Sequence, residues 1–195
     1  MRWVALSAVV AALVSISSFG FATVFQVQPG VFDPDGTGIV TAQWIGRQGL
    51  PDDVGKANQA LFLQKDGPTS ANASAFAVIG GVEGLTITEL GFDYRNDGHC
   101  GAGAPRFNVT LPDGTYFFFG CIYGAPHEAP ASDWTRITWN NSEGTVFPAG
   151  DYVWPKFPVV VQSIAIVFDE GPGFALLDNI NINGSRIGKP TVRTP

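Results

Sequence analysis

The sequence predicts an all-β protein, a single antiparallel β-sandwich that contains one disulfide and is preceded by a signal peptide. Short apolar or alternating runs recur between clusters of Gly, Pro, Asn and Asp, which is the spacing of strands and turns. No segment after the first residues has the 3.6-residue periodicity of an amphipathic helix. The 24 Gly and 14 Pro residues indicate many turns, and the 15 Phe and 5 Trp residues argue against disorder.

Residues 1–22 have the pattern of a secretory signal peptide. Arg2 is followed by an uncharged apolar run, and Gly20 and Ala22 occupy the −3 and −1 positions of a cleavage site. A membrane anchor is the less favoured alternative, because the apolar run is barely of spanning length and ends in polar, strand-like sequence. We therefore expect one mature domain over residues 23–195 that is secreted, extracellular and free of the membrane.

The charge balance excludes two classes of partner. Removal of residues 1–22 leaves 10 basic and 17 acidic side chains, without a basic stripe. Such a chain repels nucleic acid and anionic lipid. The oligomeric state stays open.

Ten segments have the composition and length of strands. In chain order they are residues 24–28, 39–45, 60–64, 76–79, 85–95, 106–111, 116–122, 134–139, 159–168 and 174–183. Two connections are predicted as hairpin turns, 112–114 and 169–173, because Pro and Gly suit tight turns. Segment 85–95 breaks strand parity, so a β-bulge near 89–91 is expected there, and two separate short strands are the alternative.

The stretch DYRNDGHCGAGAP (93–105) is interpreted as a pinned loop. It contains one of the only two cysteines, Cys100 and Cys121. An even cysteine count in an exported chain predicts one disulfide, and two free thiols are the alternative. The position across the first hairpin from Cys121 lies near residue 105 or 106, not at Cys100, so the bond would fold the glycine-rich loop back onto the end of that hairpin.

Motifs for transition metals and for nucleophilic catalysis are missing from the sequence. His99 and His127 are 28 residues apart and form no zinc-binding spacing, and no Gly-x-Ser-x-Gly element occurs. Asp93 and Asp97 could flank a substrate as paired carboxylates. Loop aspartates more often hold turns or pair with a neighbour such as Arg95.

Asp178 is the acidic residue of the last predicted strand. Counting by twos, it shares a face with Leu176, Ile180 and Ile182, whereas asparagines occupy the other face, so Asp178 is predicted to point inward. A buried carboxylate needs compensation. An arginine, a group of backbone N–H donors, or a structural calcium ion with Asp178 as a metal ligand would each supply it.

The segments SIAIVFDEG and LLDNINING resemble the last strands of galactose-binding-like jelly rolls, which include many carbohydrate-binding modules. This resemblance implies a jelly-roll sandwich, and a structural calcium held in part by an aspartate on the last strand, a role carried over to Asp178 alone. The block from Gly91 to Cys121 resembles uncharacterised secreted microbial proteins, which implies no activity.

A sugar-binding face needs aromatic rings beside polar groups, because pyranose C–H faces stack on rings while hydroxyls form hydrogen bonds. The segment DWTRITWNN (133–141) fits best, although core packing is the commoner role of any one tryptophan. Asp97 and His99 are expected at the rim of the site. The predicted ligand-binding residues are Trp134, Arg136, Trp139, Tyr123, Asp97 and His99.

Four Asn-x-Ser/Thr sequons occur, more than chance would place in this chain, and they indicate a glycoprotein if the source is eukaryotic. They begin at Asn72, Asn108, Asn140 and Asn183. Asn108 and Asn183 fall on strand faces predicted to be wet.

Three functions fit these observations, in decreasing order. The first is a secreted, non-catalytic binding module for extracellular polysaccharide or glycan. The second is a structural or surface-interaction protein of the matrix or cell wall, with the aromatic residues at an interface. The third is a small carbohydrate-active hydrolase or lyase that uses Asp93, Asp97, Asp169 or Glu170. Apart from calcium, no cofactor is expected.

Overall fold

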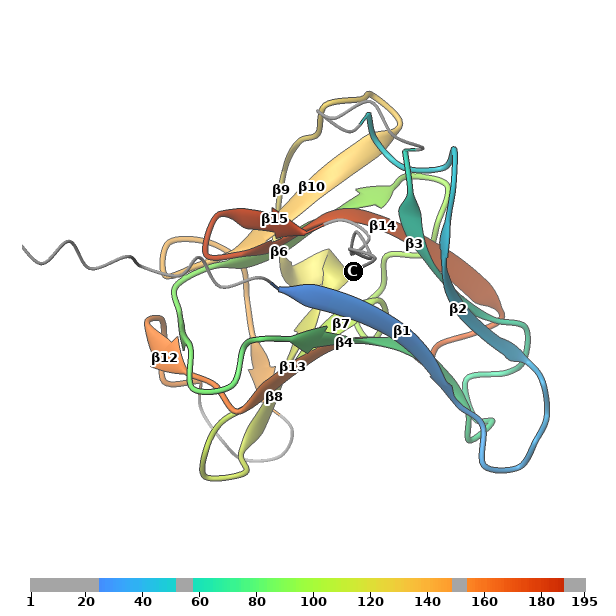
Figure 1. The fold of residues 1–195 in the computed structure, drawn as a ribbon, viewed down its shortest axis with the longest axis horizontal. Coiled ribbons are helices and arrows are strands. Elements are labelled where there is room, and N and C mark those ends of the chain that lie inside the picture. The colour runs from blue at the N-terminus through green and yellow to red at the C-terminus, as the bar shows by residue number, and fades with distance from the viewer. Residues whose placement is uncertain (1–24, 52–57, 149–153, 188–195) are drawn as a thin grey trace, which may run out of the picture.

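The computed structural model describes residues 25–51, 58–148 and 154–187. They form two antiparallel β-sheets packed face to face (Figure 1), together with one 3-10 helix, η1 (Cys121–Tyr123). The predicted all-β sandwich is confirmed. The predicted signal peptide lies outside the described residues. Within the described ranges, no helix is long and apolar enough to cross a membrane.

Each layer mixes strands from both halves of the chain, and every strand pair is antiparallel. The six-stranded sheet has the spatial order β1 (Gln26–Phe32), β4 (Ser74–Gly80), β13 (Ser163–Phe168), β7 (Arg106–Thr110), β8 (Tyr116–Gly120) and β11 (Phe147–Pro148). The seven-stranded sheet has the order β2 (Val40–Ile45), β3 (Ala60–Lys65), β14 (Gly173–Ile182), β6 (Leu90–Arg95), β10 (Trp134–Trp139) and β9 (Ala125–Glu128), with β15 (Ser185–Ile187) paired to β14. A separate ribbon pairs β5 (Thr86–Ile87) with β12 (Val159–Val160).

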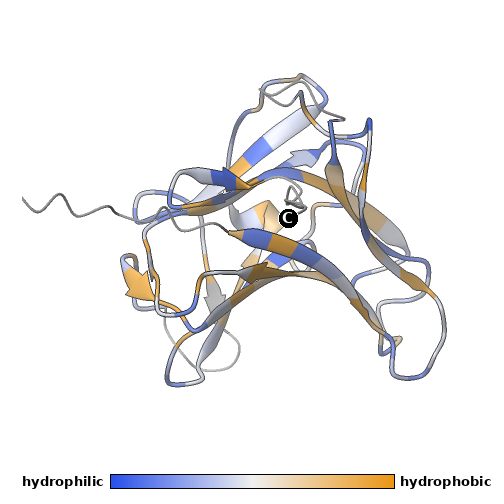
Figure 2. Ribbon diagram, viewed as in Figure 1, coloured by the Kyte–Doolittle hydropathy of each residue, from blue (hydrophilic) through white to orange (hydrophobic). Residues whose placement is uncertain are grey.

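The hydrophobic core lies between the sheets and follows from alternation along each strand. In β7, Phe107 and Val109 are fully buried, whereas Asn108 is half-buried on the outer face. Figure 2 shows hydrophobic and hydrophilic residues following one another along β1 in the same way. Alternation thus assigns one face of each sheet to the core and leaves the other face for contacts.

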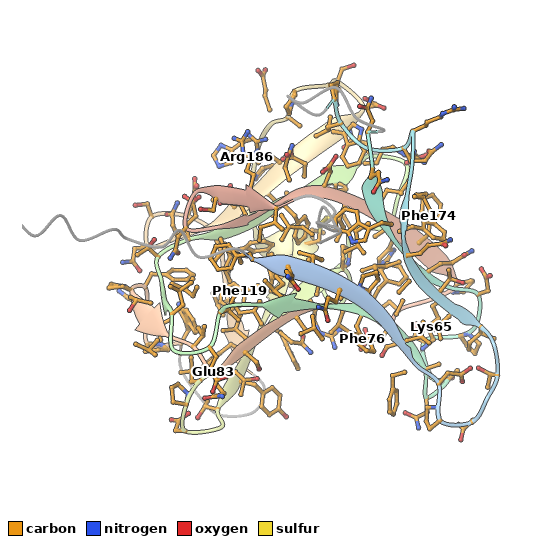
Figure 3. The ribbon with its side chains drawn as sticks, in the orientation of Figure 1. Lys65, Phe76, Glu83, Phe119, Phe174 and Arg186 are labelled. Carbon is orange, nitrogen blue, oxygen red and sulfur yellow. A yellow bond between two sulfur atoms is a disulfide. The ribbon has the colours of Figure 1, made fainter. Side chains whose placement is uncertain are left out.

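Trp139 is the centre of an aromatic cluster that joins the two sheets. Its ring lies 5.6 Å from Phe92 on the same sheet, and 5.8 and 6.0 Å from Phe107 and Phe119 on the opposite sheet. Phe119 is labelled between the layers in Figure 3. Edge-on pairs of this kind contribute about 0.5–1.5 kcal/mol each beyond the area they bury.

One of the two predicted hairpins is confirmed. β7 pairs with β8 across the turn 112–114, from Arg106↔Gly120 to Thr110↔Tyr116. The second prediction is wrong, because β13 and β14 belong to different sheets and residues 169–172 cross between the layers. Both strands turn apolar side chains toward the same core, so alternation alone does not distinguish a hairpin from a crossover.

Residues 85–95 form two strands, β5 and β6, so the alternative to the expected bulge is correct. A bulge occurs instead in β14, where Asn179 has φ +45° and the pairing with β6 shifts after Asp178. Before the bulge Leu177 faces the core, and after it Ile180 does. The inward orientation predicted for Asp178 is therefore wrong: Asp178 and Leu176 lie on the outer face of the sheet.

The predicted disulfide between Cys100 and Cys121 is present, with a Cα–Cα distance of 5.2 Å. The N–H of Cys121 donates to the carbonyl oxygen of Pro105 at 3.0 Å, as the hairpin geometry predicted. The loop lies so close to β8 that a Cβ on Gly120 would collide with the carbonyl oxygen of Ala102. The glycine-rich stretch is therefore a pinned loop.

Lys65 ends β3 with a fully buried ammonium group. Its Nζ donates to the carbonyl oxygens of Thr69 at 3.2 Å, Ala71 at 2.8 Å and Asp169 at 2.8 Å. These bonds tie the loop after β3 to the crossover between β13 and β14. Three carbonyl acceptors satisfy all three N–H donors of the ammonium, which makes its burial tolerable.

Candidate binding face

The outer face of the seven-stranded sheet carries charged and amide side chains from four adjacent strands. We call it the polar face, and its defining residues are Glu89, Asp93, Arg136, Thr138, Asn179, Asn181 and Arg186. They come from β6, β10, β14 and β15 and the residue before β6. Figure 3 labels Arg186 on the side of β15 that points away from the six-stranded sheet. Strand pairing therefore concentrates polar groups that are up to 97 residues apart in the sequence.

Asp93 and Arg136 form the fixed centre of the polar face. The Nε and Nη2 atoms of Arg136 donate to the two carboxylate oxygens of Asp93, each at 2.8 Å. The Nδ2 atom of Asn179 donates to the same carboxylate at 2.8 Å. Asp93 has no exposed surface. A bidentate pair of this kind fixes both side chains in one orientation, so Arg136 is held in place before any ligand arrives.

Asp178 lies directly across from Asp93 on the paired strand and is also buried. Its Oδ2 accepts the N–H of Leu50 at 2.8 Å, and its Oδ1 accepts the N–H of Asn179 at 2.7 Å. Backbone donors, one of the three expected remedies, thus compensate this carboxylate.

Calcium at Asp178 stays an untested prediction. Each carboxylate oxygen of Asp178 already accepts one backbone N–H. Within the described ranges, no three His, Cys, Asp or Glu side chains are grouped to hold a metal ion.

A small polar pocket lies beside this network, with a volume of about 130 Å³. Arg186, Asn181, Gly91 and Thr138 follow one another in a row across its walls and floor. Gly91 forms the floor, since it has no side chain to fill the space. A larger residue does not fit there, because its Cβ would lie 2.7 Å from the carbonyl oxygen of Ile137. The pocket exists because one position in an otherwise polar row has no side chain.

Hydrogen-bonding groups in this pocket are left free. Asn181 donates its Nδ2 to Glu89, while its buried Oδ1 has no partner among the described residues. The Arg186 side chain is exposed and forms no hydrogen bond with the described chain. A buried acceptor without a partner costs about 1–3 kcal/mol, so this site gains from a ligand that donates a hydrogen bond.

A second, wider hollow of about 630 Å³ lies along β10 and β9. Trp134, Thr135 and His127 line it. Trp134 is only 6% exposed, because it packs in a second apolar cluster with Leu50 and Leu176 under the loops of the outer face. Both hollows therefore lie along β10, where Thr135 lines the wider hollow and the next residue, Arg136, lines the small pocket.

The Arg95–Asp97 ion pair lies on the same sheet, where Arg95 is the strand neighbour of Trp134. Arg95 donates from Nε to Asp97 at 2.6 Å and from Nη2 at 3.0 Å, and also binds Gln48. The hydrogen bonds from the guanidinium hold the pKa of Asp97 below its usual value. Asp97 is thus an ionised acceptor at neutral pH.

The structure brings together only some of the predicted ligand-binding residues. Arg136 and Trp134 lie on β10 and Asp97 follows β6, but the Trp134 ring is buried and not exposed as a sugar-stacking ring would be. The prediction for Trp139 is wrong, because alternation along β10 turns its ring into the core, where it has no exposed surface. Tyr123 is half-buried in η1, on the connection between the sheets. His99 is exposed and bonds Glu170 at 2.9 Å.

Each of the four carboxylates considered for hydrolysis is held by a basic side chain. Asp93 is bound by Arg136 and Asp97 by Arg95. Asp169 accepts two bonds from Arg106, at 2.6 and 2.8 Å. Glu170 lies 2.9 Å from His99. An arrangement of two unpaired carboxylates that face each other is not found among these four residues.

Sequence reasoning missed Glu89, Arg186 and the role of Gly91. No local pattern marks them, since their positions depend on which strands become neighbours. The asparagines of the last strand were a usable signal: the face of Asn179 and Asn181 was predicted to be wet, and both line the small pocket.

No protein-family model and no curated protein sequence matches this chain. Among solved structures, the family 11 carbohydrate-binding module of the cellulosomal cellulase Lic26A-Cel5E of Clostridium thermocellum has a TM-score of 0.43 and 14% identity, over 86% of this chain and 91% of that chain. A family 11 module from Clostridium thermocellum in complex with a β-1,3-1,4-mixed-linked tetrasaccharide has a TM-score of 0.45 and 15% identity, over 88% and 95%. The enzymatically active domain of tailspike protein 4 of bacteriophage CBA120 has a TM-score of 0.39 and 14% identity, over 81% of this chain and 19% of that chain. The likeness is one of chain path.

Proposed function

We propose that this chain is a secreted, non-catalytic module that binds an extracellular oligosaccharide or polysaccharide on the polar face. The observation that carries this proposal is the buried Oδ1 of Asn181, which lacks a partner among the described residues, beside donors and acceptors that are also available. Sugar hydroxyls donate and accept hydrogen bonds, so they match a pocket that offers both kinds of group.

Preorganisation supports the same function. Two hydrogen bonds to Asp93 fix the orientation of the Arg136 guanidinium. Its third nitrogen, Nη1, has no acceptor in the described chain, so its N–H groups point in a fixed direction and are available to a ligand. A ligand then pays little to order the site, because the side chain has already lost its freedom. Asp93 matches the charge of Arg136, and Glu89 and Arg186 add one charge of each sign to the pocket, so the site suits a neutral ligand.

The size of the two hollows favours a chain of sugars over an enclosed small molecule. The small pocket, at about 130 Å³, is below the range of roughly 300–1,000 Å³ typical of pockets that enclose a drug-sized ligand. It suits one sugar unit, while neighbouring units lie along the open hollow lined by Trp134 and His127.

Retention on polysaccharides tests this function. Purified protein is incubated with a panel of insoluble cell-wall polymers, and soluble polymers are screened by affinity electrophoresis. We expect retention by at least one polymer, followed by a dissociation constant from calorimetry. Asn181→Ala should weaken that binding about tenfold, the equivalent of about 1.4 kcal/mol.

Gln28→Ala is the matched control, because Gln28 is an exposed amide on the outer face of the other sheet. It should bind like the wild type. Absence of retention on every polymer would remove the function, and unchanged affinity in Asn181→Ala would remove the assignment of the site.

A further inference from the structure

The outer face of the six-stranded sheet is the opposite of the polar face. We call it the apolar face, and its defining residues are Phe76, Val78, Ala165, Val167, Tyr116 and Phe118. Val78 and Tyr116 expose 43% and 48% of their surface. The other four residues are half-buried, and apolar side chains gathered on one exposed sheet face are typical of a contact site.

Asn108 lies in the middle of this surface. The strand registers place it directly between Ala165 of β13 and Phe118 of β8, and Val78 of β4 follows Ala165. Asn108 begins the sequon Asn-Val-Thr. This sequon asparagine on a central strand thus has apolar side chains across from it on both neighbouring strands, and the polar Arg106 and Thr110 on either side along its own strand.

The four sequons differ in what their amide groups do. Asn183 is fully engaged: its Oδ1 accepts the N–H of Thr88 at 2.7 Å, and its Nδ2 donates to the carbonyl oxygen of Thr86 at 2.8 Å. Asn140 donates its Nδ2 to Glu143 at 3.1 Å. A sugar on either amide nitrogen would compete with a structural hydrogen bond.

Asn108 has a nitrogen that is available. Its Oδ1 accepts a bond from Nε of Arg106 at 2.8 Å, which orients the amide. Its Nδ2 donates to no described residue and is not among the buried unpartnered atoms. Asn72 is exposed, whereas Asn108 is half-buried, but Asn72 lies before β4 and not on the apolar face.

We propose that Asn108 carries an N-linked glycan whose first sugar units cover the apolar face. The co-reactant is an oligosaccharide linked to a polyprenyl diphosphate. The amide nitrogen of Asn108 forms a bond to the anomeric carbon, the bond from that carbon to the phosphate oxygen breaks, the nitrogen loses one proton, and polyprenyl diphosphate leaves. The inference rests on the export proposed above and is independent of glycan binding on the polar face.

The chemistry of the face matches a glycan. The C–H groups of a sugar ring pack on rings and aliphatic groups such as Phe118 and Val78. The hydroxyls find neutral partners at the border, for example Gln28 beside Val78 and Thr110 beside Tyr116. The one nearby guanidinium, of Arg106, is neutralised by Asp169 and stacks 4.7 Å from the Phe118 ring centroid.

Expression of the full chain in a yeast secretory host tests the inference. Glycopeptide mapping, with and without enzymatic removal of N-glycans, reports the occupancy of each sequon. We expect Asn108 to be modified in most molecules and to remain modified in Thr110→Ser, which keeps the sequon. Thr110→Ala removes the sequon without changing Asn108 and should abolish modification there. An unmodified Asn108 in the wild type would overturn the inference.

A matched pair of variants tests whether the glycan covers the apolar face. Asn108→Gln and Asn72→Gln each remove one sequon. Asn108→Gln should self-associate at high concentration in sedimentation velocity and bind more of a hydrophobic dye, whereas Asn72→Gln should match the wild type. Thr110→Ala should repeat the behaviour of Asn108→Gln, which separates loss of the glycan from a folding defect. If both remain monomeric with unchanged dye binding, the covering role is wrong.

Discussion

The outer faces of the two sheets differ in what they carry: one has buried, paired charges, and the other has exposed apolar side chains. The polar side contains two buried carboxylates and compensates both: Arg136 binds Asp93, and backbone N–H groups bind Asp178. The apolar face carries few charges and leaves side chains such as Val78 exposed. The polar face is therefore stabilised by specific pairs of side chains, whereas the apolar face needs only a covering group such as the glycan proposed above. Substitutions should therefore have large effects on the first face and small effects on the second.

The largest effect is expected from Arg136→Met, which removes the partner of a carboxylate with no exposed surface. Breaking a buried ion pair from one side costs about 3–5 kcal/mol. Urea unfolding should show this loss, and adding Asp93→Asn should restore more than half of it. A loss below about 1 kcal/mol would mean that Asn179 and the sheet compensate Asp93 without Arg136.

The next largest effect is expected from the disulfide. Cys100 lies in the connection from β6 of one sheet to β7 of the other, and Cys121 begins η1, directly after β8. Replacing Cys100 and Cys121 by alanine opens a loop with a sequence separation of 21. The free energy of unfolding should fall by about 3 kcal/mol. The wild type measured in reductant is the control and should unfold like the double variant; a clear difference between the two would contradict the loop-entropy explanation.

A matched pair on the six-stranded sheet sharpens the comparison within one layer. Val109 points into the core and is fully buried, whereas Val78 lies on the apolar face. Val109→Thr should cost about 1–3 kcal/mol, because it buries a hydroxyl. Val78→Thr should stay within about 0.5 kcal/mol of the wild type. Thermal unfolding of both variants decides this, and equal losses would show that the apolar face is packed like a core.

The smallest effect is expected at the turn between β7 and β8. The N–H of Thr115 donates to Asp113 at 2.9 Å and lowers the pKa of that carboxyl. The folded pKa lies below the unfolded value of about 3.9, so the stabilisation is present above that pH and is lost as pH falls through the folded pKa. Asp113→Asn should thus be slightly less stable than the wild type at pH 7, with equal stability in strong acid. A gap that persists in acid would point to a cause other than ionisation.

The sequence predicts elements whose partners are near in the chain. Strands β7 and β8 and the disulfide were predicted because a short turn brings their residues together. Sheet membership is non-local: nothing within residues 159–183 distinguishes a hairpin from the observed crossover at 169–172. The bulge in β14 is a borderline case, since Asn179 is a residue type that tolerates the left-handed conformation.

The candidate site shows the same division. Alternation along β10 correctly places Arg136 and Trp139 on opposite faces of the sheet. It does not show which of the two faces is the core, so Trp139 was wrongly predicted to bind ligand. Glu89 and Arg186 become neighbours of Asn181 only through the pairing of β14 with β6 and β15. A binding site on a sheet face is a property of strand order, and strand order is what a single sequence shows least.

Lys65 joins the loop after β3 to the crossover between β13 and β14 in the way that a bound metal ion joins loops in other proteins. The positive group that gathers carbonyl oxygens of residues 69, 71 and 169 is covalently part of the chain. Dilution cannot deplete it and a chelator cannot extract it, whereas a bound metal ion in the same place could be lost in either way.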